Sequence, residues 1–259
     1  MNILLPEYLL IFVIGAALGS FLNVVIYRIP QGKSIVLPAS HCPRCQRPIK
    51  AYENIPILSY IFLRGRCAGC KERISLQYPL VEATMGLLAA LLLAYYGWRW
   101  ELLLYGSMAA VLLALSVIDI QTCRLPNKIV LTGAIMAVAL TLIFFRERWL
   151  AMILGGAVGL GLMIIMGLIG NLLFRKDTLG MGDVKLAGMM GLFLGHWHTA
   201  GMFILGVFIG AVAGSVMILL GGKKWGQRIP FGPYLAMGGL VSLLWGEMIW
   251  RWYLSLVIR

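Results

Sequence analysis

The chain consists largely of long apolar segments, and this restricts its fold more than any other feature of the sequence. About 20 apolar residues are long enough to cross the hydrocarbon core of a bilayer as a helix. Eight stretches approach or exceed this length: 8–27, 79–97, 102–120, 129–145, 149–174, 184–197, 199–220 and 233–256. Because lipid offers no partners to backbone N–H and C=O groups, such segments form helices. The sequence therefore predicts an all-α polytopic membrane protein with about eight transmembrane helices.

The composition and the placement of the charges agree with this class. Hydrophobic residues make up 61% of the chain and charged residues only 12%, whereas a soluble domain has about 25% charged residues. The formal net charge of +12 would also suit a nucleic-acid-binding protein. Most of the Lys and Arg residues, however, fall in alternate connections between the apolar segments. We therefore expect a lipid bilayer, and no nucleic acid, as the partner that the charge reflects.

The basic connections also predict the orientation. They are residues 28–78, 121–128, 175–183 and 221–232. Cytoplasmic loops are enriched in Lys and Arg, so these four should face the cytoplasm and both termini the opposite side. The first residues lack a basic region and a small-residue cleavage site, which favours a retained first helix.

The longest polar stretch, residues 28–78, carries two Cys-x-x-Cys pairs. They are Cys42-Pro-Arg-Cys45 and Cys67-Ala-Gly-Cys70. Two such pairs in one small insert are typical of a four-cysteine zinc ribbon, in which the metal replaces a hydrophobic core. Redox dithiols or disulfides are the alternative, and a reducing cytosol disfavours them. The sequence thus predicts three parts: a first transmembrane helix (1–27), a cytoplasmic four-cysteine insert (28–78) and a seven-helix membrane domain (79–259).

Two aspartates lie at the ends of very apolar segments, Asp119 in Leu-Ser-Val-Ile-Asp-Ile and Asp183 in Gly180-Met-Gly-Asp. A carboxylate at membrane depth is costly, so it marks a functional site by default. The alternative is that each acid merely marks where a helix leaves the lipid. Two acids that meet across a bundle suggest an aspartic protease, whose pair shares a proton and activates a water. Asp177, in the same loop as Asp183, is expected to be a solvated carboxylate.

Several longer motifs follow one another along nearly the whole chain. They are Gly19-Ser-Phe-Leu-Asn-Val-Val-Ile-Tyr-Arg-Ile-Pro30, Glu53-Asn-Ile-Pro56, Gln77-Tyr-Pro-Leu-Val-Glu82, Asp119 with Leu125-Pro-Asn127, Gly180-Met-Gly-Asp-Val-Lys-Leu186 and Ile229-Pro-Phe-Gly-Pro-Tyr-Leu-Ala236. In this order they resemble the motifs of the bacterial type IV prepilin peptidase (leader peptidase/N-methyltransferase) family. The paired cysteines match the zinc-containing bacterial branch. The resemblance implies an inner-membrane aspartic endopeptidase with eight spans. The family's two catalytic aspartates correspond to Asp119 and Asp183.

The resemblance also implies the substrates. Such enzymes remove the short basic leader of type IV prepilins or type II secretion pseudopilins, cutting after a glycine at the cytoplasmic face. Many members then methylate the new amino terminus with S-adenosylmethionine. For this step Glu53 and Glu82 are candidate contacts of the amine or of the cofactor, although Glu82 would equally suit an ion pair with Arg28 or Arg73. The chain has no glycine-rich Rossmann fingerprint.

Two other classes of protein remain as alternatives. One is a transporter or channel with a zinc-stabilised cytosolic insert, and the other is a membrane scaffold. A transporter favours polar groups near mid-bilayer, broken helices and repeat symmetry, whereas the acids here lie at one face and no internal repeat is evident. A scaffold would not require the two acids.

Overall fold

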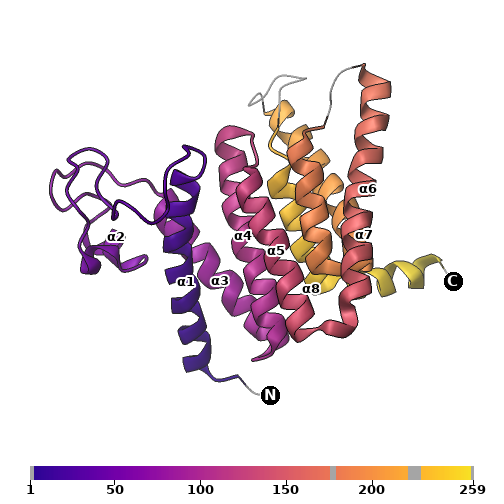
Figure 1. The fold of residues 1–259 in the computed structure, drawn as a ribbon, viewed down its shortest axis with the longest axis horizontal. Coiled ribbons are helices and arrows are strands. Elements are labelled where there is room, and N and C mark those ends of the chain that lie inside the picture. The colour runs from indigo at the N-terminus through magenta and orange to yellow at the C-terminus, as the bar shows by residue number, and fades with distance from the viewer. Residues whose placement is uncertain (1–2, 176–178, 221–228, 258–259) are drawn as a thin grey trace. The chain divides into compact units, whose positions relative to one another are not determined.

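The computed structural model describes residues 3–175, 179–220 and 229–257, and in these ranges the regular elements are helices (Figure 1). Six helical stretches in the described part are long and apolar enough to cross a membrane: Leu5–Arg28, Gln77–Tyr96, Trp100–Thr122, Asn127–Phe144, Arg146–Leu173 and Met181–Leu219. The predicted all-α polytopic class is confirmed. Asp177 and the basic residues Lys223, Lys224 and Arg228 lie outside the described residues.

The chain forms two compact units, Met1–Ala114 and Leu115–Arg259. In the first unit, α1 (Leu5–Arg28) packs against α3 (Gln77–Tyr96), and α4 (Trp100–Thr122) begins. Glycines allow α1 and α3 to approach closely. A Cβ atom on Gly15 would lie 2.8 Å from the carbonyl oxygen of Met85. Small residues at a crossing are a common means of packing membrane helices.

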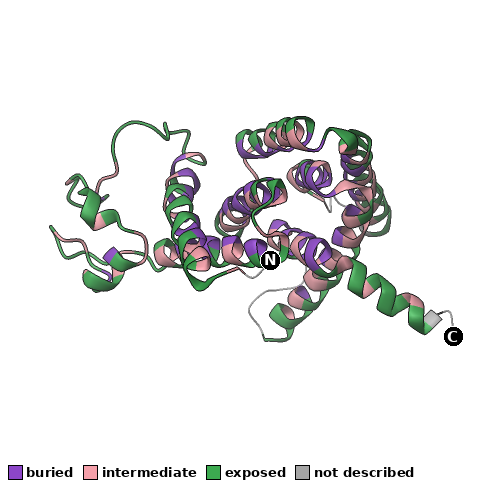
Figure 2. Ribbon diagram, turned by 90° about the horizontal axis from the view of Figure 1, so that it is seen from below, coloured by how far each residue is buried: buried purple, intermediate pink, exposed green. Residues whose placement is uncertain are grey.

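The insert between α1 and α3 contains little regular structure. It holds a 3₁₀ turn, η1 (Ala51–Asn54), the short helix α2 (Leu58–Phe62) and two isolated β-bridges, His41 with Pro48 and Arg66 with Arg73. Figure 2 shows most of this segment as exposed. With so few buried apolar side chains the insert needs another source of stability, as the sequence predicts.

In the second unit, α7 (Met181–Leu219) packs against α6 (Trp149–Phe174) and α8 (Gly232–Val257), and Figure 1 shows these three helices beside one another. The unit also contains the end of α4, α5 (Asn127–Phe144) and the 3₁₀ turn η2 (Arg146–Arg148). The closest approach of α6 to α7 pairs Gly155 with Gly191, where a Cβ atom on either would overlap the other's backbone.

Helix α7 is interrupted at Gly195, whose φ of 72° and ψ of 170° are not helical. Its 39 residues would extend about 58 Å at about 1.5 Å per residue, almost twice the thickness of the hydrocarbon core. The break divides α7 into two shorter helices, and the hydroxyl of Thr199 donates to the carbonyl oxygen of Gly195 at 2.6 Å. These correspond to the predicted segments 184–197 and 199–220, although the break comes at Gly195 rather than at residue 198.

Candidate functional site

Asp119 lies near the end of α4 and is buried, with 4% of its surface exposed. Its Oδ2 atom accepts a hydrogen bond of 2.9 Å from the backbone N–H of Gly232, the first residue of α8. The first N–H groups of a helix have no partner within the helix, and the N-terminus of the helix dipole favours a negative charge. The start of α8 therefore holds one carboxylate oxygen of Asp119 in a defined position.

Gly232 leaves no space for a side chain at this contact. A Cβ atom there would lie 2.9 Å from Asp119 Oδ2 and 3.5 Å from Leu186 Cδ2. Leu186 follows Asp183 on α7 by about one helical turn. The glycine thus joins three elements, since the end of α4, the first turns of α7 and the start of α8 meet around it.

Asp183 lies in the first turn of α7, where a carboxylate also interacts favourably with the helix dipole. Its N–H donates to the carbonyl oxygen of Gly180 at 3.0 Å. A Cβ atom on Gly180 would lie 3.3 Å from Asp183 Oδ2, so the carboxylate folds back over this glycine. The side chain is half-buried. Both aspartates belong to the second unit, and Leu186, about one turn after Asp183, borders Gly232 together with the carboxylate of Asp119.

The turn between α4 and α5 packs against the start of α7. Leu125 approaches Gly182, where a Cβ atom would lie 3.2 Å from that of Leu125. The ammonium group of Lys185 donates to the side-chain oxygen of Asn127 at 3.1 Å. The contact of Leu125 explains the glycine directly before Asp183, because a side chain at position 182 would push the turn away.

The four cysteines of the insert form one cluster. The Sγ atoms of Cys42, Cys45, Cys67 and Cys70 all lie within 4.8 Å of one another, and those of Cys42 and Cys70 are 3.8 Å apart. Tetrahedral zinc with Zn–S bonds of about 2.3 Å requires sulfurs about 3.8 Å apart. The donor set and its spacing therefore fit a closed structural zinc site.

Both halves of this cluster have the same backbone geometry. In the first, Cys42 N–H donates to Arg47 O at 3.0 Å. In the second, Cys67 N–H donates to Glu72 O at 2.8 Å. Each second cysteine is followed by a residue with positive φ, Gln46 at 60° and Lys71 at 61°, which turns the chain back. Hydrogen bonds from the backbone of Cys70 and Gly69 lower the pKa of the Cys67 thiol to about 6. At Cys70, a backbone hydrogen bond from Glu72 is outweighed by burial and the neighbouring thiols, which raise the pKa to about 11. Zinc binds cysteines as thiolates.

The acids predicted near a methyl donor, Glu53 and Glu82, have partners within the protein. Glu53 forms an ion pair with Arg47 and accepts a hydrogen bond of 3.1 Å from the N–H of Lys50. The hydrogen bond from Arg47 and that from Lys50 hold the pKa of Glu53 below its ordinary value. Both interactions lie within the insert and help to order it.

Glu82 is buried. Among the described residues it forms an ion pair with neither Arg28 nor Arg73. Its Oε2 accepts the N–H of Ile57 at 2.7 Å, and the hydroxyl of Ser20 donates to the same carboxylate. Ile57 has a φ of 63°, which is rare for a β-branched residue. Glu82 therefore holds a strained turn of the insert against α1 and α3.

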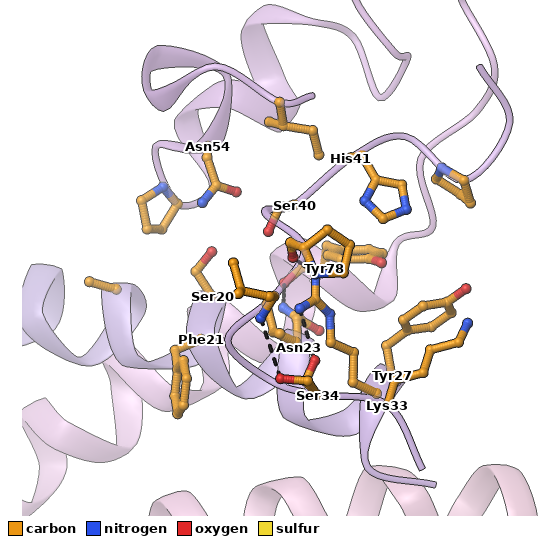
Figure 3. A pocket seen from close by; sticks show the side chains of 18 residues that line it. Ser20, Phe21, Asn23, Tyr27, Lys33, Ser34, Ser40, His41, Asn54 and Tyr78 are labelled. Atoms are coloured by element: carbon orange, nitrogen blue, oxygen red, sulfur yellow. Dashed lines mark hydrogen bonds between the residues drawn. The ribbon is translucent and has the colours of Figure 1, made fainter. Parts of the chain in front are cut away.

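Sequence reasoning missed two features. One is the contact of Gly232 with Asp119, for which the motif around Ile229-Pro-Phe-Gly was the only signal. The other is a pocket of about 790 Å³ in the first unit, formed by one face of α1, the loop 33–43 and Tyr78 (Figure 3). Neither Glu53 nor Glu82 lines it. Its signal was Asn23, a polar residue within the first apolar span.

Comparison with known proteins gives a consistent result. Residues 13–96 match the family described as the bacterial peptidase A24 N-terminal domain, and residues 106–215 match the type IV leader peptidase family. No solved structure matches the chain.

Curated relatives match almost the whole chain, and those that follow are each named prepilin leader peptidase/N-methyltransferase. The protein of Aeromonas salmonicida (strain A449) is 35% identical over 96% of this chain and 94% of its own length. That of Stutzerimonas stutzeri is 36% identical over 94% and 92%, and that of Neisseria gonorrhoeae is 33% identical over 95% and 94%. With this identity over nearly full length, and with both parts of the chain matched, the chain belongs to the type IV leader peptidase family.

Proposed function

We propose that this protein is an aspartic endopeptidase of the bacterial inner membrane that removes the leader of type IV prepilins or type II secretion pseudopilins. Cleavage follows a glycine and takes place at the cytoplasmic face. The names of the relatives support the reaction and the substrate class. The positive-inside pattern of the loops supports the side.

The observation that carries this proposal is the meeting of the helix ends that bear Asp119 and Asp183. Asp119 is buried and held by the N–H of Gly232, and the same glycine borders Leu186, which follows Asp183 by about one turn of α7. Two carboxylates that meet across a water molecule would share a proton, because both cannot carry a charge cheaply.

The ionised and the protonated carboxyl group have different roles in the reaction. The ionised carboxylate takes a proton from a water molecule, which then attacks the scissile carbonyl carbon. The protonated acid donates a hydrogen bond to the carbonyl oxygen and stabilises the charge that develops there. The scissile C–N bond then breaks, and the carboxyl group that took the proton of the water gives it to the leaving amine. The N–H of Gly232 orients the carboxyl group of Asp119. The attacking water and the scissile carbonyl therefore face a carboxyl group in a fixed position.

A second step, S-adenosylmethionine-dependent N-methylation of the new amino terminus, completes the proposed function. Methylation needs a neutral amine and a bound methyl donor but neither aspartate. The two activities should therefore be separable. Zinc bound by the four cysteines would hold the insert folded and take no part in either reaction.

Mass spectrometry of a prepilin peptide incubated with the purified protein tests both steps. We expect loss of the leader after glycine, and gain of a methyl group only when S-adenosylmethionine is present. The Asp119→Asn protein should leave intact prepilin uncleaved and still methylate a peptide that begins at the mature residue. If wild type methylates that peptide and the variant does not, the two reactions share a site.

We expect Gly232→Ala to lower kcat by about a hundredfold, with a smaller effect on KM. The added methyl group would displace the Asp119 carboxylate, and misplacing a catalytic group by about 1 Å costs about this factor. Steady-state cleavage of a prepilin peptide measures both constants. Gly161→Ala is the matched control, because a Cβ atom there meets nothing within 4 Å. Equal kcat values for the two variants would show that the contact with Gly232 does not position Asp119.

A further inference from the structure

The insert exposes large apolar side chains around α2, although the sequence predicts that residues 28–78 lie outside the membrane. Ile55, Leu58, Ile61 and Phe62 have 48, 51, 61 and 80% of their surfaces exposed. All four lie within eight consecutive residues of the chain. A gathering of exposed apolar surface marks a place where a partner or a membrane binds. The segment around α2 therefore requires a covering that the insert itself does not provide.

Helix α2 turns its polar side chains toward the rest of the insert. Ser59 is buried, and its hydroxyl donates to the carbonyl oxygen of Tyr52 at 3.0 Å. The hydroxyl of Tyr60 donates to the carbonyl oxygen of Ile74 at 3.5 Å. A helix on a water-exposed surface has the opposite arrangement, with its polar face outward and its apolar face buried. The outer face of α2 is therefore suited to an apolar medium.

A hydrogen bond to α3 fixes the depth of this segment. The N–H of Ile57, the residue before α2, donates to Oε2 of Glu82 at 2.7 Å. Helix α3 has 20 residues, which extend about 30 Å and match the thickness of the hydrocarbon core. Its ends therefore lie at the two boundaries of the core. Glu82 comes five residues after the first residue of α3, so Ile57 lies about 8 Å inside the boundary at about 1.5 Å per residue.

Contacts with α1 give the same result. The hydroxyl of Ser20, which donates to the carboxylate of Glu82, lies eight residues before the end of α1. Asn54 and Pro56 line the pocket of Figure 3 together with Ser20 and Phe21. The chain before α2 thus runs beside parts of α1 and α3 that lie within the span. Because both helices are long and apolar enough to cross a membrane, the medium around them at this depth is lipid.

Two exposed arginines, Arg64 and Arg66, follow α2 directly. Neither forms an ion pair within the part of the chain that the structure describes, and the two acids of the insert, Glu53 and Glu72, pair with other arginines. An apolar face followed by unpaired basic residues is typical of segments that lie between the acyl chains and anionic headgroups of a bilayer. The charge therefore indicates the same partner as the depth.

We propose that residues 55–66 form a membrane-surface anchor that binds anionic phospholipid in the leaflet bordering the insert. The side chains of Leu58, Ile61 and Phe62 enter the acyl chains, and Arg64 and Arg66 bind lipid phosphates. Segments of this kind are buried about 5–10 Å into the boundary of the bilayer, which agrees with the depth of Ile57. The anchor holds the four-cysteine cluster at the membrane surface. It is independent of the proposed peptidase chemistry, because it involves neither aspartate.

Photo-crosslinking of the full chain tests the contact with lipid directly. The photoreactive residue p-benzoylphenylalanine would replace Phe62, whose exposure leaves space for the larger ring. The protein would be irradiated in nanodiscs of phosphatidylcholine and phosphatidylglycerol. We expect lipid to attach as efficiently as it does with the probe at Leu87, an exposed residue in the middle of α3. With the probe at Arg44, exposed in the first cysteine turn, the yield should be about a tenth or less, because that turn lies beyond the anchor.

The other occupants of this face would give different products. If the probe at Phe62 attaches to a second copy of the chain or to another segment of the same chain, and takes up no more lipid than the probe at Arg44, the membrane-surface anchor is wrong.

The composition of the attached lipid tests the two arginines. Phosphatidylglycerol should be enriched about fivefold over its share in the nanodisc, the effect of a basic residue at an anionic surface. Arg64→Gln combined with Arg66→Gln should abolish this enrichment while lipid still attaches at Phe62. Equal enrichment with and without the two substitutions would show that the arginines do not bind the phosphates, and would overturn the selection of anionic lipid.

Discussion

Replacing either aspartate by asparagine should lower kcat/KM for prepilin cleavage by about 10²–10⁴-fold, the usual effect of losing an acid or base. An amide has nearly the shape of the carboxyl group but cannot share or transfer a proton. In Asp119→Asn the side-chain oxygen can still accept the N–H of Gly232, so the start of α8 should stay in place. Hydrolysis of a prepilin peptide, followed by mass spectrometry, measures the loss.

Asp177→Asn serves as the control for both variants, since the sequence indicates a solvated loop carboxylate there. We expect this variant to cleave at the rate of wild type. All three proteins should insert into the membrane in equal amounts, which separates lost chemistry from lost folding. Full cleavage by Asp183→Asn, or loss of cleavage in Asp177→Asn alone, would remove the proposed pair from the mechanism.

The purified protein should contain about one zinc per chain, and Cys42→Ser should lose it. A structural zinc site contributes about 10–16 kcal/mol to folding in small zinc domains. The insert buries few apolar side chains of its own, so it should unfold locally without the metal. Elemental analysis measures the zinc. Hydrogen exchange should show loss of protection within residues 40–75 while α6, α7 and α8 keep theirs.

Cys123→Ser provides the matched control, because Cys123 lies just after α4 and outside the four-sulfur cluster. It should retain the metal and the protection of the insert. Two disulfides and no metal in protein prepared under reducing conditions would overturn the zinc assignment. Loss of protection in α6–α8 together with the insert would contradict the view that the helices are stable without it.

The sequence alone was sufficient to predict the features that depend on short stretches of the chain. Apolar segments of bilayer length determine helices, because lipid excludes other backbone partners. The structure confirms the all-helical class and shows that the two Cys-x-x-Cys pairs meet. Each pair folds as a tight turn with its own backbone bonds, so its geometry is encoded within a few residues. Only the joining of the two turns needs the rest of the insert.

The features that only the tertiary structure decided involve residues far apart in the chain. The N–H of Gly232 contacts Asp119 across 113 positions, and nothing local in either segment predicts which backbone group will reach the carboxylate. Glu82 accepts a hydrogen bond from the N–H of Ile57 and does not pair with an arginine, because the fold places the turn at Ile57 next to its carboxylate. Asn23 donates through Nδ2 to the carbonyl oxygen of Tyr78, 55 positions away, while its Oδ1 has no donor among the described residues. Hydropathy and spacing determine which segments become helices, whereas packing between helices determines which polar groups meet, since those pairings depend on the final three-dimensional approach of the helices.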